Sequence, residues 1–137
     1  MPKKILITLL AVVLALAPIC ALAAQFSTDP DAIELAAKSI LMLEAHPLFP
    51  RKANIEFCRV IDRENVQVLV WERGCGPTLA CGTGSCAVLA AGVTMQLIDR
   101  SAAIHLPGGT LHDHWAEDGH IYMRGPAAAV ANGQFLD

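Results

Sequence analysis

The chain has 137 residues, a formal net charge of −3 and a hydrophobic fraction of 54%. This length is enough for one domain. The sequence has no long basic stretch, so we do not expect nucleic acid as a partner. The apolar N-terminus contributes much of the hydrophobic fraction, so the rest of the chain is less apolar than the whole.

The first 23 residues have the three-part pattern of a secretory signal. A short basic start (Met1–Lys4) precedes an uninterrupted apolar run (Ile5–Ala17), and Ala21-Leu22-Ala23 is a small-x-small cleavage site. We therefore expect residues 1–23 to be a signal segment and residues 24–137 to form the domain. The alternative is an uncleaved membrane anchor, which the short apolar run disfavours; membrane contact is expected only through this segment.

An amphipathic packing helix is expected next. Asp29 can cap it, and Pro30 suits its first position. Apolar residues then recur at helical spacing as far as Leu43. Pro47 and Pro50 end the helix and favour an extended passage after it.

An antiparallel hairpin follows, formed by Ile55–Ile61 and Val66–Trp71 with a polar turn between them. Glu72 and Arg73 come directly after its second strand and offer one charge of each sign. Arginine has a fork of donors that suits a carboxylate, and glutamate can pair with an ammonium group. This pair indicates a ligand that carries both groups, such as an amino acid.

A glycine-rich loop leads from these charges to the most apolar helix of the chain. The stretch Glu72–Ala87 reads ERGCGPTLACGTGSCA and places Cys81 at the first turn of a helix that begins near Gly84. A helix that is apolar all round is usually buried. The free N–H groups at its N-terminus bind anions and stabilise a thiolate. Cys81 is therefore a candidate acid, base or nucleophile.

Short strands are expected after the apolar helix, at Ala103–Leu106, Thr110–Ala116, Ile121–Met123 and Val130–Leu136. Short strands around a single apolar helix indicate an α+β domain in which a curved sheet wraps that helix. The chain has five cysteines but no C-x-x-C pair, so we expect no zinc site. Cys58 and Cys86 are interpreted as small buried apolar residues.

The string ERG-x-G-x-TLACGTG-x-CA closely resembles the signature around the second catalytic cysteine of diaminopimelate epimerases. Further matches lie in the same order at HPLFPRKAN (His46–Asn54), LPGG-x-L (Leu106–Leu111) and YMRGPA (Tyr122–Ala127). The resemblance covers the C-terminal half of that family. It implies one of two pseudo-symmetric half domains, in which a curved, barrel-like, mostly antiparallel sheet is wrapped around one central apolar helix.

The resemblance implies a reaction as well as a fold. Diaminopimelate epimerases invert an amino-acid α-carbon, from LL- to meso-diaminopimelate in lysine and peptidoglycan precursor synthesis, with two cysteines and no cofactor or metal. Cys81 matches the second acid/base cysteine, and Gly82 and Thr83 match residues that contact the reacting carboxylate. The residues that match those binding the other end of the substrate are Asn54, Glu72 and Arg73.

The family pattern also bears on the strand around residue 113. Leu111, position 113 and Trp115 face inward in that pattern, so His112 and His114 are expected in solvent rather than at a metal. Asp113 departs from the apolar residue that is usual there, and weaker packing is expected around it.

The half that bears the first cysteine in the family has no counterpart in this sequence. Cys86 cannot replace it, because five residues of helix rise about 7.5 Å and turn well round the axis. Three interpretations stay open: an inactive fragment, an enzyme completed by a homodimer or by the missing N-terminal half, and an exported amino-acid-binding module. The family is cytoplasmic whereas residues 1–23 resemble a secretory signal, so the location stays open too.

Overall fold

The structure is a computed structural model, which describes residues 30–134. The predicted signal segment and the predicted cap Asp29 lie outside these residues. The elements are, in order, α2 (Pro30–Glu44), β1 (Ile55–Asp62), β2 (Asn65–Glu72), β3 (Gly76–Thr78), α3 (Gly82–Thr94), β4 (Ser101–Leu106), β5 (Gly109–Trp115) and β6 (Ile121–Arg124). Neither helix in this part of the chain is long and apolar enough to cross a membrane.

The six strands form one mixed sheet with the order β1-β2-β4-β5-β6, and β3 pairs with β2 near its other end. The only parallel pair among the described strands is β2 with β4, where Asn65–Gln67 lie beside Ala103–His105. A parallel pair needs a long crossover, and α3 is that crossover. The α+β class and the mostly antiparallel sheet against one apolar helix are therefore confirmed.

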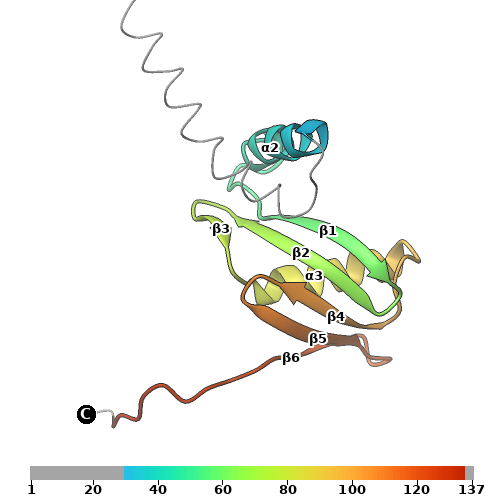
Figure 1. Cartoon of the computed structure of the whole chain (residues 1–137), viewed down its shortest axis with the longest axis vertical. Helices are drawn as coiled ribbons and strands as arrows, with labels where there is room; N and C mark the ends of the chain where they lie inside the picture. The colour runs from blue at the N-terminus through green and yellow to red at the C-terminus, as the bar shows by residue number, and fades with distance from the viewer. Residues whose placement is uncertain (1–29, 135–137) are drawn as a thin grey trace, which may run out of the picture.

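The described sheet is not closed into a barrel, because β1 and β6 are its two ends and do not pair. Figure 1 shows α3 lying across one face of this open sheet. One side of α3 consequently stays uncovered, and Ala87, Ala91 and Met95 are exposed there.

The main core lies between α3 and the centre of the sheet. Val68 and Ile104 of the sheet and Leu89 of α3 are fully buried, and the cluster extends to Val66, Val70, Val88, Ile98, Ala102 and Leu106. Burying an aliphatic side chain contributes about 1.5–3 kcal/mol. This contact, rather than the low helix propensity of the glycine-rich first turn, holds the N-terminus of α3 in place.

A second, smaller core packs α2 onto the outer face of the hairpin. Ile40 and Ile55 are buried there, with Phe57 and Trp71 packed against them. Figure 1 shows α2 beyond β1. Side chains alternate along a strand, so the intervening residues of β1 face α3 instead.

Two local predictions are corrected by this arrangement. Cys58 is exposed rather than buried, because β1 is an end strand with an uncovered inner side. The strand predicted at residues 130–136 does not form over residues 130–134. Residues 125–134 instead extend away from the body without secondary structure (Figure 1), and Val130 is 95% exposed.

Candidate active site

Cys81 is the N-cap of α3. Its backbone is extended, with φ −142° and ψ 111°, and its Sγ accepts a hydrogen bond from Gly84 N at 3.4 Å. The same Sγ lies 3.4 Å from Oγ1 of Thr83. Ser85 N donates to Cys81 O at 3.0 Å, which is the first bond of the helix. The predicted position of the thiol at a helix N-terminus is confirmed.

The residues after Cys81 surround the thiol with donors. The N–H groups of Gly82 and Thr83 lie in the first turn of α3, where no helical carbonyl is available to accept their hydrogen bonds. They therefore point out of the end of the helix. Thr83 is exposed, whereas Gly82 packs on β6, where an added Cβ would lie 3.0 Å from Cε of Met123. Together with the helix dipole, these groups make an end of α3 that suits a carboxylate.

Asn54 and Arg73 meet at the open end of the hairpin. Arg73 N donates to Oδ1 of Asn54 at 3.0 Å, and Nη1 of Arg73 donates to the carbonyl of Arg51 at 3.1 Å. Both side chains are exposed. The hairpin register explains this contact: Ile55 pairs with Trp71, so Asn54 lies level with Glu72 and within reach of Arg73, the next residue.

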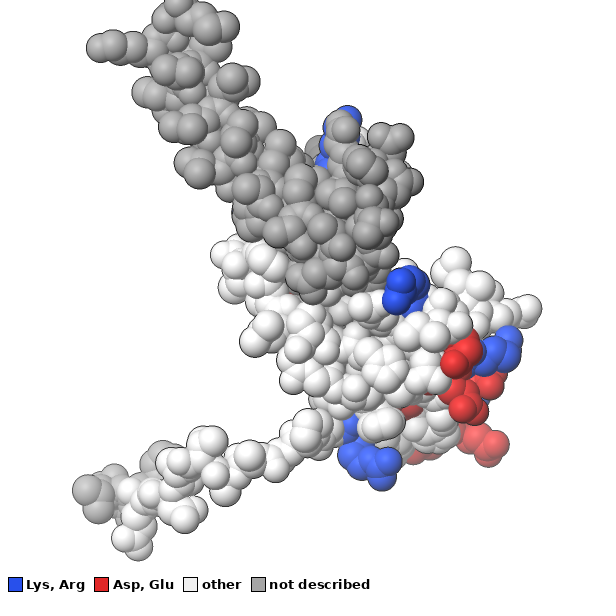
Figure 2. Space-filling view, viewed as in Figure 1, with Lys and Arg blue, Asp and Glu red and all other residues white. Residues whose placement is uncertain are grey.

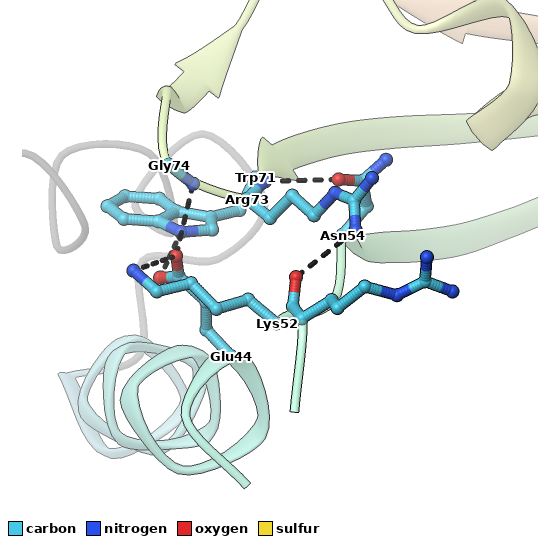
Figure 3. A network of polar contacts seen from close by, with 7 residues as sticks. Glu44, Lys52, Asn54, Trp71, Arg73 and Gly74 are labelled. Atoms are coloured by element: carbon cyan, nitrogen blue, oxygen red, sulfur yellow. Dashed lines mark hydrogen bonds and ion pairs between the residues drawn. The ribbon is translucent and has the colours of Figure 1, made fainter. Parts of the chain in front are cut away.

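Glu44, which sequence reasoning missed, ties the end of α2 to the same loop. Its carboxylate accepts from Trp71 Nε1 at 2.9 Å and from Gly74 N at 3.2 Å, and it pairs with Lys52 Nζ at 3.4 Å. Figure 3 shows Glu44 reaching from α2 towards Trp71 and Gly74. The hydrogen bond from Trp71 is the main reason that the pKa of Glu44 is lowered, with smaller contributions from Gly74 and Lys52.

Glu72 lies on the side of the hairpin that is nearer to α3. It is half-buried, and its Oε1 accepts from Oγ1 of Thr78 at 2.7 Å. Its charge acts on Glu56, a neighbouring carboxyl on β1, and Glu56 in turn contacts the first turn of α3. Glu72 therefore lies on the face of the hairpin that carries Glu56 and faces α3, whereas Asn54 and Arg73 form a separate exposed pair.

The histidines lie away from this region. His112 and His114 are exposed on β5, while Asp113 between them is buried, which confirms the predicted facing of that strand. Both histidines line an open cavity of about 640 Å³ on the outer face of the sheet, whose lining includes none of the predicted site residues. Within residues 30–134, no group of three or more histidine, cysteine or carboxylate side chains could hold a metal ion.

Charged side chains are sparse over the centre of the face shown in Figure 2 and gather towards its edges. At the turn between β1 and β2, Arg63 pairs with Asp99 at 2.6 Å, so acidic and basic groups are interspersed there. Nothing on this face distinguishes it as a binding surface, and the candidate site remains the region between the N-terminus of α3 and the open end of the hairpin.

The family model of diaminopimelate epimerase matches residues 24–130. The diaminopimelate epimerase of Desulfitobacterium hafniense is 52% identical over 95 residues, which are 69% of this chain and 34% of that protein. That of Synechococcus elongatus is 48% identical over 108 residues, 79% of this chain and 38% of that protein. That of Methylorubrum extorquens is 45% identical over 107 residues, 78% of this chain and 36% of that protein.

The chain thus spans little more than about a third of the length of the curated relatives that it matches. The match nevertheless covers most of the chain and includes the N-terminus of α3 and the open end of the hairpin. The chain therefore belongs to the diaminopimelate epimerase family.

Proposed function

We propose that this chain provides one face of an amino-acid epimerase site, in which Cys81 exchanges a proton with the α-carbon of diaminopimelate. The observation that carries the proposal is the place of the thiol: Cys81 caps α3, and its Sγ receives the N–H of Gly84 at 3.4 Å. A thiol held among backbone donors can act as an acid or a base. The names of the relatives support the choice of substrate.

The two ends of the substrate would be held by different residues. The N–H groups of Gly82 and Thr83 would receive the carboxylate next to the reacting carbon, since donors there also stabilise the negative charge that develops. Asn54 and Arg73 would bind the carboxylate of the other end, and Glu72 its ammonium group. Arg73 suits this role because its guanidinium is exposed at the open end of the hairpin.

Inversion requires an acid on the opposite face of the α-carbon. Cys86 does not supply it, because this half-buried thiol lies further along α3 and burial raises its pKa. We propose that a second polypeptide surface supplies the acid, either a segment equivalent to the remainder of the relatives or a second copy of this chain. Two-fold dimers are the commonest closed assemblies of identical chains.

The alternative proposal is an exported amino-acid-binding module that keeps the pocket without turnover. The signal-like pattern of residues 1–23 favours it, because a secreted domain would be separated from cytoplasmic precursor synthesis. Exposed, unpaired thiols are prone to oxidation in such a compartment, and Cys58 and Cys75 are exposed.

The test is incorporation of α-deuterium into meso-diaminopimelate in D₂O, with the purified chain, Cys81→Ala and the control Cys86→Ala. We expect exchange with inversion that Cys81→Ala abolishes and Cys86→Ala keeps, together with a dimer in solution. Exchange with retention would mean that Cys81 acts as a single base. Saturable binding without any exchange would contradict the enzyme proposal and support the binding module.

A further inference from the structure

Gly84 lies against both the Glu56 carboxyl and the Cys81 thiol. A Cβ built on Gly84 would lie 2.7 Å from Oε1 of Glu56 and 3.3 Å from both Cβ and Sγ of Cys81. Separations below 3.0 Å do not occur for real Cβ atoms. The space beside Gly84 is therefore already filled by two groups, the thiol and the Glu56 carboxyl, which both lie within 3.3 Å of the same point.

The strand pairing explains why Glu56 is there. Glu56 pairs with Val70 of β2, and its side chain is on the inner side of β1, which faces α3. It follows Ile55, whose side chain packs on α2 at the other face, so alternation directs the carboxyl inward. A charged residue on the row that faces an apolar helix is unusual, and it occurs level with the first turn of that helix.

The Glu56 carboxyl is only partly hydrated. It is half-buried, and the pKa of Glu56 is raised, first by burial and further by the charge of Glu72. The titratable groups that face it are Cys58 on β1, Glu72 on β2 and Cys81 at the start of α3. All three become negative when they ionise, so Glu56 and Cys81 do not both ionise without repulsion.

We propose that Glu56 is a positioning residue that acts through Cys81 and keeps its thiol protonated in the resting site. A carboxylate beside the thiol opposes the helix N-terminus, which alone would favour the thiolate. The pair then holds one negative charge, and Cys81 is ready to donate a proton rather than to remove one. This role rests on the proposed function of Cys81 as an acid and base, but the charge effect itself does not require turnover.

Alkylation of Cys81 tests the proposal without any substrate. In a chain whose other cysteines are replaced by serine, the thiolate of Cys81 attacks the methylene carbon of iodoacetamide, a C–S bond forms and iodide leaves. The rate at each pH from 5 to 10 therefore reports the thiolate fraction. We expect Glu56→Gln to react about five- to tenfold faster at pH 7, since a unit charge at this range has an effect of that order. At pH 10, where the thiol is ionised in both chains, the rates should converge.

Two further variants separate this role from a structural one. Glu56→Asp keeps the charge and should retain most of the slow wild-type rate at pH 7. Glu64→Gln removes an exposed carboxylate at the turn between β1 and β2, and should change the rate less than twofold. Equal pH profiles for Glu56→Gln and the wild type, or equal acceleration by Glu64→Gln, would overturn the proposal.

Folding is checked by circular dichroism on each variant. If Glu56→Gln does not fold, Gly84→Ala takes its place, because its methyl group pushes the carboxyl away from the thiol. Faster alkylation of that variant supports the proposal, and an unchanged rate contradicts it. A chain that exchanges no α-deuterium but shows the Glu56 effect would refute the proposed function alone.

Discussion

Asp113 is the most unusual buried residue of the described chain. Its side chain is 2% exposed, and neither carboxylate oxygen has a hydrogen-bond partner within residues 30–134. Burial raises the pKa of this carboxyl. The sequence indicated weaker packing at this position. The structure places a buried carboxyl there, next to Ser85 and Cys86 of α3, and its burial outweighs the partial compensation that Ser85 and the charge of His112 supply.

Replacing Asp113 by leucine should therefore stabilise the protein. We expect a gain of about 1–3 kcal/mol in the free energy of unfolding at pH 7, measured by urea denaturation. Asp113→Asn removes the charge but keeps the unpaired polar group, so its gain should be smaller. A loss of stability in Asp113→Leu would show that the carboxylate has a partner that compensates its burial.

The same substitution has a defined pH dependence. In the folded chain the pKa of the Asp113 carboxyl lies above its ordinary value of 3.8. Its contribution to the free energy of unfolding is therefore fully present below pH 3.8, and it is lost as pH rises through the pKa of the folded chain. The advantage of Asp113→Leu over the wild type should therefore grow between pH 4 and pH 7. A constant difference over that range would contradict the raised pKa.

At the scale of elements, the position of α3 depends on close packing against the loop that follows it. A Cβ on Gly92 would lie 2.6 Å from Cδ1 of Ile98, a core residue that is 2% exposed. The glycine lowers helix propensity by about 1 kcal/mol relative to alanine, yet it lets the segment after α3 pack directly against the helix. Leu97 N and Ile98 N both donate to the carbonyl of Gly92, and these hydrogen bonds hold that segment against α3.

Gly92→Ala should consequently destabilise the protein by about 1–3 kcal/mol, although alanine is the better helix former. Thermal unfolding measures the change. The variant Gly92→Ala with Ile98→Val, which makes room for the added methyl, should recover part of the loss. Ala91→Gly on the exposed side of α3 is the matched control, with a loss of about 1 kcal/mol from propensity alone.

The elements also show where prediction from sequence succeeds. The bounds of the first helix and of the hairpin were predicted to within one or two residues, because their apolar spacing and turn residues are local signals. The prediction of a strand at residues 130–136 was wrong over residues 130–134, which the structure describes. An apolar segment forms a strand only when another strand is available to pair with it. Local pattern alone does not supply that partner.

At the scale of the molecule, the core is one-sided. Ile104 at the centre of β4 is fully buried, whereas Ile61 at the end of β1 is 56% exposed. The open sheet covers one side of α3 and leaves an apolar groove between that helix and the inner row of β1, which includes Val60. Stability therefore depends on the centre of the sheet much more than on its ends.

Removing one methyl group from each of these two isoleucines tests the one-sided core. Ile104→Val should cost about 1 kcal/mol of unfolding free energy, because the lost methyl leaves a small cavity. Ile61→Val should change it by less than about 0.5 kcal/mol, as is usual at exposed positions. Equal losses in urea denaturation would mean that the end of β1 is covered in solution, as it would be in an assembly.

The sequence by itself determined the family, the α+β class, the apolar helix and the place of Cys81 at its N-terminus, because each depends on residues close together in the chain. The resemblance also grouped Asn54 with Arg73, and the register of the hairpin brings the two together. The tertiary structure alone decided that Glu56 lies beside the thiol and that the sheet stays open. Those features depend on which strands pair and on how α3 packs across them, and contacts between residues far apart in the chain leave no local pattern.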